Sequence, residues 1–238
     1  MNFPPTRLSV VERMRSADEE TRRLALAAIV EAYWKPIYKY VRLKWHLTPD
    51  AAADLTQDFF TTALEKDVLG RFDPARARLR TYLRLCVDGF VSNAKKAEGR
   101  LKRGGAFLSV PLDFETAEGE IRSHEPSVPA DVDELFYQEW VRTLFQLAVD
   151  DLREWARSTG RSVMFDVFCR YDLVPSPDDR PTYAALGREF ALPATTVTNH
   201  LAAARRQFRG IVLNRLRELT TTVEEFEAEA RRLLGGNP

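Results

Sequence analysis

Residues 183–208 read YAALGREFALPATTVTNHLAAARRQF, and this stretch carries the clearest structural pattern in the chain. Thr182 is a suitable N-cap for a short helix that ends at Phe190. Residues 191–193 follow as a turn. A second helix is predicted over 194–208, where apolar side chains recur at i, i+4, i+7 and i+11. These side chains are Val197, Leu201, Ala204 and Phe208.

The other side of the second predicted helix is polar. The same spacing places Thr195, Asn199, Ala202 and Arg206 on it, with Thr198 and His200 adjacent. This is the layout of a helix-turn-helix, whose second helix enters the major groove. There Asn pairs with adenine, Thr contacts a base edge or a thymine methyl group, and Arg binds guanine. The competing interpretation is a structural helical hairpin. Five arginines would attract the DNA backbone: Arg205, Arg206, Arg209, Arg215 and Arg217.

The N-terminal half contains two further predicted helices. One apolar face is formed by Leu26, Ile29, Val30, Tyr33, Ile37, Tyr40 and Val41. The next helix begins with Thr48 as N-cap and Pro49 at its first position, and its buried stripe is Leu55, Phe59 and Ala63. An acidic stripe on this helix is formed by Asp54, Asp58, Thr61 and Glu65, with Gln57 beside it. The stripe is either a solvated face or a docking face for a basic partner.

Residues 71–84, RFDPARARLRTYLR, interleave basic with aromatic and aliphatic side chains. A basic run follows, formed by Lys95, Lys96, Arg100, Lys102 and Arg103. Cations around aromatic rings suit single-stranded nucleic acid, because the cations hold phosphates and a base stacks on a ring. Tyr82 is the ring in question, and the alternative for it is an ordinary core tyrosine.

The formal net charge is zero, but the charges are segregated. Residues 71–103 hold ten basic and three acidic residues, a net of +7, and residues 180–217 hold seven and one, a net of +6. Between them, residues 112–139 hold one basic and nine acidic residues, a net of −8. Residues 106–134 contain three prolines and show no helical period, so we expect a linker there. If this linker or the C-terminal tail packs on a basic domain, it masks DNA binding.

Several function classes are not expected. We find no Ser/His/Asp set, glycine-rich phosphate loop or clustered metal ligands, so we expect no enzyme, cofactor or metal. Cys86 and Cys169 do not make a disulfide framework. No apolar run approaches the roughly 20 residues that span a bilayer, and no signal pattern opens the chain. We therefore expect a cytoplasmic, all-α protein with no membrane partner.

These residues resemble a known family. Residues 183–208 look like domain four of bacterial sigma factors of the extracytoplasmic-function (ECF) group. Residues 50–60, DAAADLTQDFF, resemble the domain-two helix that grips core RNA polymerase, and residues 79–83, LRTYL, resemble the promoter-melting part. The stretches RFDP (71–74) and KRGG (102–105) are similar to a branch found beside Ser/Thr kinases.

The resemblance implies a role for each matching position. The polymerase-binding residues would be Asp54, Gln57, Asp58 and Thr61. Contacts to the -10 element and the melted strand would come from Tyr82, Arg84, Asn93, Lys95, Lys96 and Arg100. The -35 element would be read at Thr198 and Asn199, beside the polar positions Thr195, Ala202 and Arg206 named above.

The resemblance also implies an architecture and a function. The segments would be sigma domain two (1–105), an acidic linker (106–138), sigma domain four (139–217) and a helical C-terminal extension (218–238). The chain would direct core RNA polymerase to promoter DNA, with an anti-sigma factor or a Ser/Thr kinase as a candidate further partner. The alternative is a helix-turn-helix regulator that binds duplex DNA without polymerase.

The chain departs from the family pattern in two segments, and each departure motivates a further hypothesis. The acidic docking cluster is thinned to DAAAD at 50–54, so phosphorylation of Thr56 or Thr61 would restore negative charge there; the alternative is an unmodified threonine. The extension beyond residue 217 has a helical spacing of Val223, Phe226, Ala230 and Leu233. It would serve as a lid, a partner site or a cap on domain four.

Overall fold

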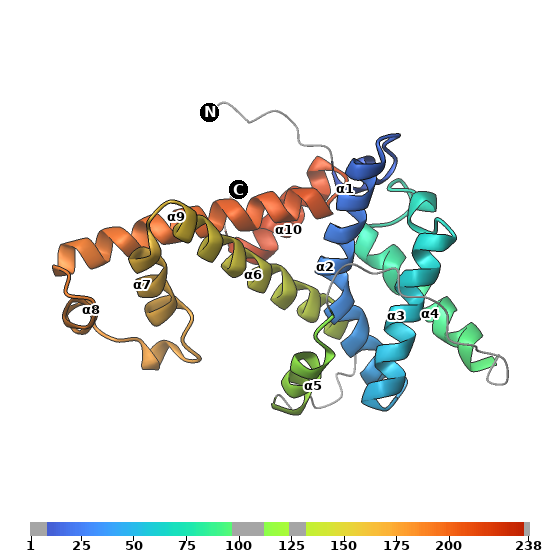
Figure 1. The fold of residues 1–238 in the computed structure, drawn as a ribbon, viewed down its shortest axis with the longest axis horizontal. Helices are drawn as coiled ribbons and strands as arrows, with labels where there is room; N and C mark the ends of the chain where they lie inside the picture. The colour runs from blue at the N-terminus through green and yellow to red at the C-terminus, as the bar shows by residue number, and fades with distance from the viewer. Residues whose placement is uncertain (1–8, 97–111, 124–131, 236–238) are drawn as a thin grey trace. The chain divides into compact units, whose positions relative to one another are not determined.

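The computed structural model describes residues 9–96, 112–123 and 132–235, and the regular structure in this part of the chain is helical (Figure 1). The prediction of an all-α fold is confirmed. Two short 3-10 turns lie at Leu69–Arg71 and Pro177–Asp179. The α-helices are α1 Val10–Met14, α2 Glu19–Lys44, α3 Pro49–Glu65, α4 Leu79–Lys96, α5 Phe114–Ser123, α6 Val132–Ser158, α7 Ser162–Asp172, α8 Tyr183–Glu189, α9 Ala194–Leu219 and α10 Val223–Leu234.

The chain divides into two compact units. The first unit comprises Met1–Thr143 and Leu216–Pro238, and the second comprises Leu144–Arg215. The first unit therefore includes α5 and α10 as well as α1 to α4. This division differs from the segment boundaries expected from the sequence, because residues 112–123 and 218–235 pack with the N-terminal helices.

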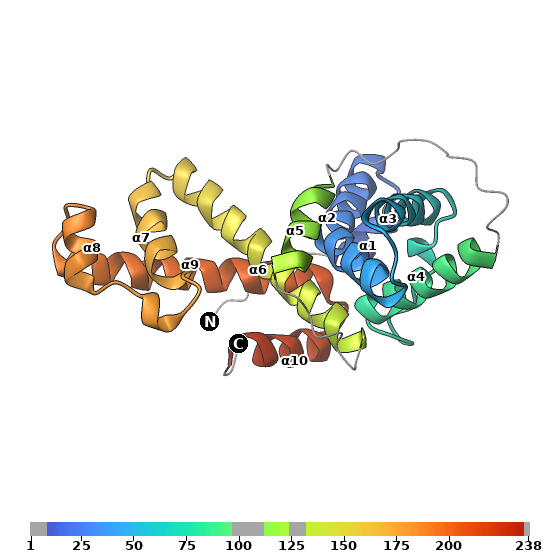
Figure 2. The same cartoon turned by 90° about the horizontal axis from the view of Figure 1, so that it is seen from below.

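α2 is the central helix of the first unit, and α1, α3, α4 and α5 pack against it (Figure 2). Its N-cap is Asp18, whose carboxylate accepts a hydrogen bond from the backbone N–H of Thr21 at 2.8 Å. The predicted apolar face is buried except for Leu26, which is half-buried. α3 begins as predicted, with Thr48 as N-cap and Pro49 in its first turn.

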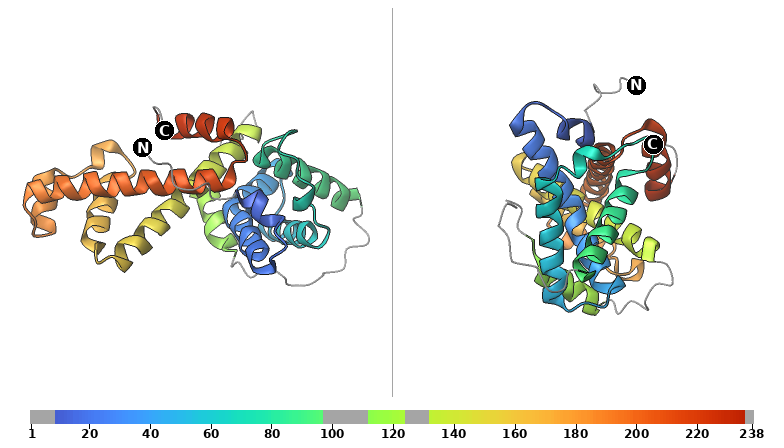
Figure 3. Two further views of the ribbon diagram at one scale, coloured as in Figure 1. Left: turned by 90° about the horizontal axis from the view of Figure 1, so that it is seen from above. Right: turned by 90° about the vertical axis from the view of Figure 1, so that its right-hand side faces the viewer.

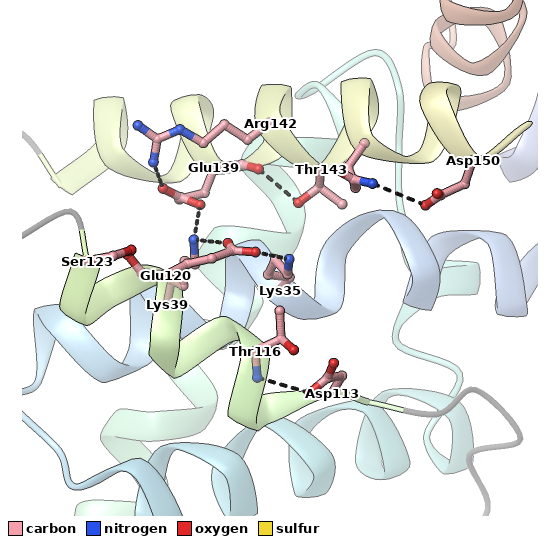
Figure 4. Close-up of polar contacts among 11 residues, drawn as sticks. Lys35, Lys39, Asp113, Thr116, Glu120, Ser123, Glu139, Arg142, Thr143 and Asp150 are labelled. Carbon is pink, nitrogen blue, oxygen red and sulfur yellow. Dashed lines mark hydrogen bonds and ion pairs between the residues drawn. The ribbon is translucent and has the colours of Figure 1, made fainter. Parts of the chain in front are cut away.

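The prediction of a linker without helical structure is wrong for residues 114–123, which form α5. The Asp113 carboxylate accepts a hydrogen bond from the backbone N–H of Thr116 at 3.0 Å at the start of this helix. The Phe114 ring packs against Tyr38, with centroids 5.0 Å apart. Glu118 and Glu120 of α5 face cations of α2. Figure 4 shows this for Glu120, which pairs with Lys35 at 2.6 Å and with Lys39 at 2.7 Å. Glutamates that look solvated in the sequence are therefore packing residues.

Lys39 joins α5 and α6 to α2. Its side chain is 4% exposed, and its ammonium group donates to Glu120 and to Glu139 of α6, both at 2.7 Å (Figure 4). Glu118 of α5 accepts from the Tyr38 hydroxyl at 2.9 Å and from Arg42 at 3.2 Å. Removing one member would leave the others buried without their charge partner, which is strongly destabilising.

The predicted C-terminal helix is confirmed as α10, with Thr222 as its N-cap. Ala230 is buried, whereas Val223 at the opposite end is 67% exposed. α10 belongs to the first unit, where it meets Arg78, Arg80 and Tyr137. Of the three alternatives for this extension (a lid, a partner site or a cap on domain four), the cap does not fit the assignment of α10 to the first unit.

The second unit is built from the end of α6, from α7 and α8, and from most of α9 (Figure 3). One buried cluster joins Leu152, Ala156, Met164, Phe168 and Ala204. Within the described residues, no helix combines the length and the apolar character that a bilayer crossing requires.

Candidate nucleic-acid interface

The α8–turn–α9 segment of the second unit has the predicted helix-turn-helix layout. The Thr182 hydroxyl accepts from the backbone N–H of Ala185 at 3.1 Å and caps α8. In the turn, Ala191 has a left-handed φ of 53°, and the N–H of Leu192 donates to the carbonyl of Gly187 at 2.8 Å. A Cβ atom at position 187 would lie 2.7 Å from the carbonyl oxygen of Leu192. The turn therefore needs glycine there.

The predicted buried stripe holds α8 against α9. Val197 and Leu201 of α9 are buried together with Leu186 of α8 and Val167 of α7. Ala204 is buried, and Phe208 is half-buried with its ring 5.4 Å from that of Phe168. α9 continues beyond the predicted end at 208. The sequence contains the signal, since Val212 and Leu216 extend the same apolar spacing and are fully buried.

The predicted reading face of α9 is open to solvent. Its exposed residues are Thr195, Thr198, Asn199, Ala202 and Arg206. The Thr198 hydroxyl donates to the carbonyl of Ala194 at 3.1 Å, so it is turned along the helix. Within the described residues, the structure shows no hydrogen bond for the side chains of Asn199 or Arg206. Their donors are therefore available to base edges or phosphates.

The arginines expected to attract the DNA backbone are partly engaged. Arg205 pairs with Asp172 through two hydrogen bonds of 2.8 and 2.9 Å, and this contact raises the pKa of the guanidinium group. Arg215 pairs with Asp151 at 2.6 and 2.7 Å. Arg217, in the first unit, stacks over the Phe226 ring at 4.6 Å. Arg206 is therefore the clearest exposed cation beside the reading face.

Tyr82 lies in a different environment from the one a base-stacking residue needs. Its hydroxyl donates to the carbonyl of Val68 at 2.6 Å, and its ring packs on Phe72 with centroids 5.2 Å apart. Burial raises the pKa of Tyr82 to about 12. The alternative of a tyrosine packed into the first unit describes its position better than a free stacking platform.

Arg84 is also engaged within the first unit. Its guanidinium group lies 3.0 Å from Asp133 and 3.3 Å from Asp88, and its side chain is 18% exposed. In contrast, Asn93, Lys95 and Lys96 are exposed in the last turns of α4. Arg100 lies outside the described residues. The structure thus leaves the end of α4, and not Tyr82 or Arg84, accessible to a strand.

The predicted docking residues lie together on α3. Asp54 and Gln57 are exposed, whereas Asp58 and Thr61 are half-buried. Partial burial raises the pKa of Asp58, and the neighbouring Asp54 carboxylate raises it further. A cationic partner surface would relieve this repulsion.

Thr56 is not an accessible phosphorylation site. It is fully buried, and its hydroxyl donates to the carbonyl of Ala52 at 2.7 Å. The residue lies on the buried side of α3. The phosphorylation hypothesis therefore applies to Thr61 alone.

The sequence patterns did not predict one buried charge cluster of the first unit, which is centred on Glu229. The carboxylate of Glu229 on α10 accepts from Arg78 at 2.7 Å, from Arg80 at 3.0 Å and from the Tyr137 hydroxyl at 3.1 Å. Burial and the Glu229 charge raise the pKa of Tyr137 to about 12. The contacts join residues 92 to 151 positions apart, so no local spacing reveals them. The sequence does contain one indication of this cluster: Glu229 lies next to Ala230, on the apolar side of an amphipathic helix, where a charged residue needs a partner.

Within the described residues, no group of three or more His, Cys, Asp or Glu side chains is arranged to hold a metal ion. No family model, curated protein or solved structure matches the chain.

Proposed function

We propose that the chain is a promoter-specificity subunit of bacterial RNA polymerase, of the kind that the ECF sigma factors represent. The observation that carries the proposal is the exposed polar face of α9, a helix that follows the capped short helix α8 and a tight turn. Asn199 and Arg206 offer the amide and guanidinium donors that read bases in the major groove. The chain would contribute binding only, with no catalytic step of its own.

Two features of the first unit support the polymerase part of the proposal. The Asp54–Asp58 pair on α3 is a concentration of negative charge that suits a basic docking surface. Asn93, Lys95 and Lys96 at the end of α4 are exposed and suit capture of a melted strand. In this mechanism, the cost of unstacking bases is offset by contacts to the strand, and α9 fixes the position on the duplex.

A regulator that binds duplex DNA without polymerase is the second candidate. The same reading face of α9 favours it. A dimer of such a regulator would select palindromic half-sites about one helical turn apart.

Co-purification with core RNA polymerase from the host cell separates the two candidates. We expect the unmodified chain to bind core polymerase and Asp54→Lys to abolish binding. Asp166→Lys is the matched control, because Asp166 is an exposed acid on α7 of the second unit. Failure of the unmodified chain to bind would contradict the sigma proposal.

The reading face predicts a second outcome that both candidates share. Asn199→Ala should relax selectivity at one base position and cost about 1–3 kcal/mol of discrimination, because the amide no longer pairs with adenine. Selection of bound sequences from a random duplex pool measures this. Ser162→Ala on α7 is an exposed control away from the face. An unchanged preference at every position would contradict the assignment of Asn199.

A further inference from the structure

Two arginines of the basic stretch 71–84 converge on a single carboxylate. Arg78, just before α4, and Arg80, in its first turn, both donate to Oε1 of Glu229, at 2.7 and 3.0 Å. The Tyr137 hydroxyl of α6 donates to Oε2 at 3.1 Å. The Glu229 side chain is 2% exposed. Three donors therefore surround one anion that is almost completely removed from water.

This donor set also suits a phosphate group. Guanidinium groups bind carboxylates and phosphates with the same charge-assisted hydrogen bonds, and a hydroxyl adds a third donor. Two arginines carry more positive charge than the single Glu229 carboxylate neutralises. A phosphodiester oxygen would occupy the same position with the same charge.

Arg80 is held in place by residues outside α10. Its guanidinium group lies over the rings of Tyr137 and Trp140 of α6, 4.6 and 4.8 Å from their centroids. Arg78 has a side chain that is 47% exposed at the outer side of the cluster. Arg80 therefore keeps its position when the carboxylate is withdrawn, and Arg78 adds an exposed second cation beside it.

Besides the Glu229 contacts, α10 is held by Phe226, whose ring lies 4.6 Å from the Arg217 guanidinium group, and by Arg232. Arg232 lies over the Tyr137 ring at 3.7 Å and reaches Glu134 at 3.5 Å. Ala230 is the buried apolar residue of the helix, and Val223 is 67% exposed. A 12-residue helix is marginal in water by itself, so breaking these interactions would release and melt it.

We propose that Arg78 and Arg80 form a phosphate-binding site for single-stranded nucleic acid, and that Glu229 of α10 occupies this site in the free chain as an internal competitor. The inference rests on the nucleic-acid binding of the proposed function and adds a site and its occlusion. Binding of a strand replaces the Glu229 carboxylate by a phosphate and displaces α10.

Fluorescence anisotropy of the full chain with a labelled single-stranded DNA of mixed sequence tests this. Glu229→Gln should bind about tenfold more tightly, because the competitor has lost its charge. Adding Arg78→Ala and Arg80→Ala to Glu229→Gln should abolish the gain and flatten the salt dependence by about 0.7 in slope for each phosphate that is no longer neutralised. Glu227→Gln is the matched control, since it removes the same charge from a half-exposed position of α10.

Equal affinity of Glu229→Gln and Glu227→Gln would overturn the inference. If Glu229→Gln fails to fold, the inference is tested by measuring amide hydrogen exchange of α10 in the unmodified chain, with and without the strand. The strand should then increase exchange in α10, and a bound strand that leaves α10 protected overturns the inference. Binding of core polymerase and of duplex DNA is measured on the same preparation. Failure of both would sink the proposed function, whereas success of either with α10 still protected would sink only the occluded site.

Discussion

Gly187 shows how one hydrogen atom in place of a methyl group permits the tight turn before α9. A Cβ atom there would lie 2.7 Å from a backbone oxygen, and a backbone atom cannot move aside without opening the turn. The neighbouring Ala191 already takes a left-handed conformation. The geometry of the α8–α9 turn thus depends on the missing side chain at position 187 as well as on the packing of the two helices.

This geometry predicts opposite effects for two glycines. Gly187→Ala should destabilise the second unit by about 1–3 kcal/mol and weaken duplex binding, because the turn must shift. Gly210→Ala in α9 has open space around its Cβ and should stabilise by about 0.5–1 kcal/mol. Urea denaturation followed by circular dichroism measures both. A Gly187→Ala variant as stable as the unmodified chain would contradict the steric argument.

Among the elements, α9 could be predicted from the sequence and α5 could not. In α9 the apolar and polar residues alternate with the helical period, so the sequence contains both its buried side and its open side. In α5 the partners of Glu118 and Glu120 are cations 76 to 85 positions earlier in the chain. A glutamate that pairs with a distant lysine reads locally like a solvated one. For the same reason the prediction missed Asp133 as a partner of Arg84, and it missed the distant partners of Glu229.

The contact between α5 and α2 should depend on pH. Burial acts to raise the pKa of Glu120, but the hydrogen bonds from Lys35 and Lys39 outweigh it, so that the pKa lies below its ordinary value of 4.5. A lowered folded-state pKa means that the stabilisation is complete above pH 4.5 and is lost as the pH falls through the lowered value. Urea denaturation at stepped pH measures it.

Glu120→Gln should remove this part of the acid sensitivity and be less stable than the unmodified chain near neutral pH. Glu115→Gln is the control, because Glu115 is exposed on the same helix. Identical pH profiles for Glu120→Gln and the unmodified chain would show that the lysine pair does not hold α5.

For the molecule as a whole, each unit carries its own thiol reporter. Cys86 lies in the first unit and Cys169 in the second, and burial raises the pKa of both thiols. A raised pKa lowers the thiolate fraction, so both should react slowly with a disulfide reagent near neutral pH. Both should react fast in denaturant.

The labelling rate of Cys169 can test how much Leu201 contributes to the stability of the second unit. Leu201 is 1% exposed between α8 and α9, and its truncation should cost about 2–5 kcal/mol. The labelling rate of Cys169 should rise accordingly, as followed by mass spectrometry, while Cys86 gives the simultaneous reading in the first unit. Thr195→Ala, at an exposed position of α9, should leave the rate of Cys169 unchanged. An unaltered rate in Leu201→Ala would contradict the packing of Leu201.

The Glu229 contact affects how binding of a single strand depends on the concentration of that strand. Because α10 is covalently attached, Glu229 competes at a fixed effective concentration that dilution of the protein does not change. The apparent affinity for a strand is the intrinsic affinity reduced by the fraction of chains with α10 released. Isolated strands at low abundance would then leave the site closed, and a strand presented next to Arg78 and Arg80 by an already assembled complex would open it. The helix would act as a threshold that distinguishes a tethered strand from a free one.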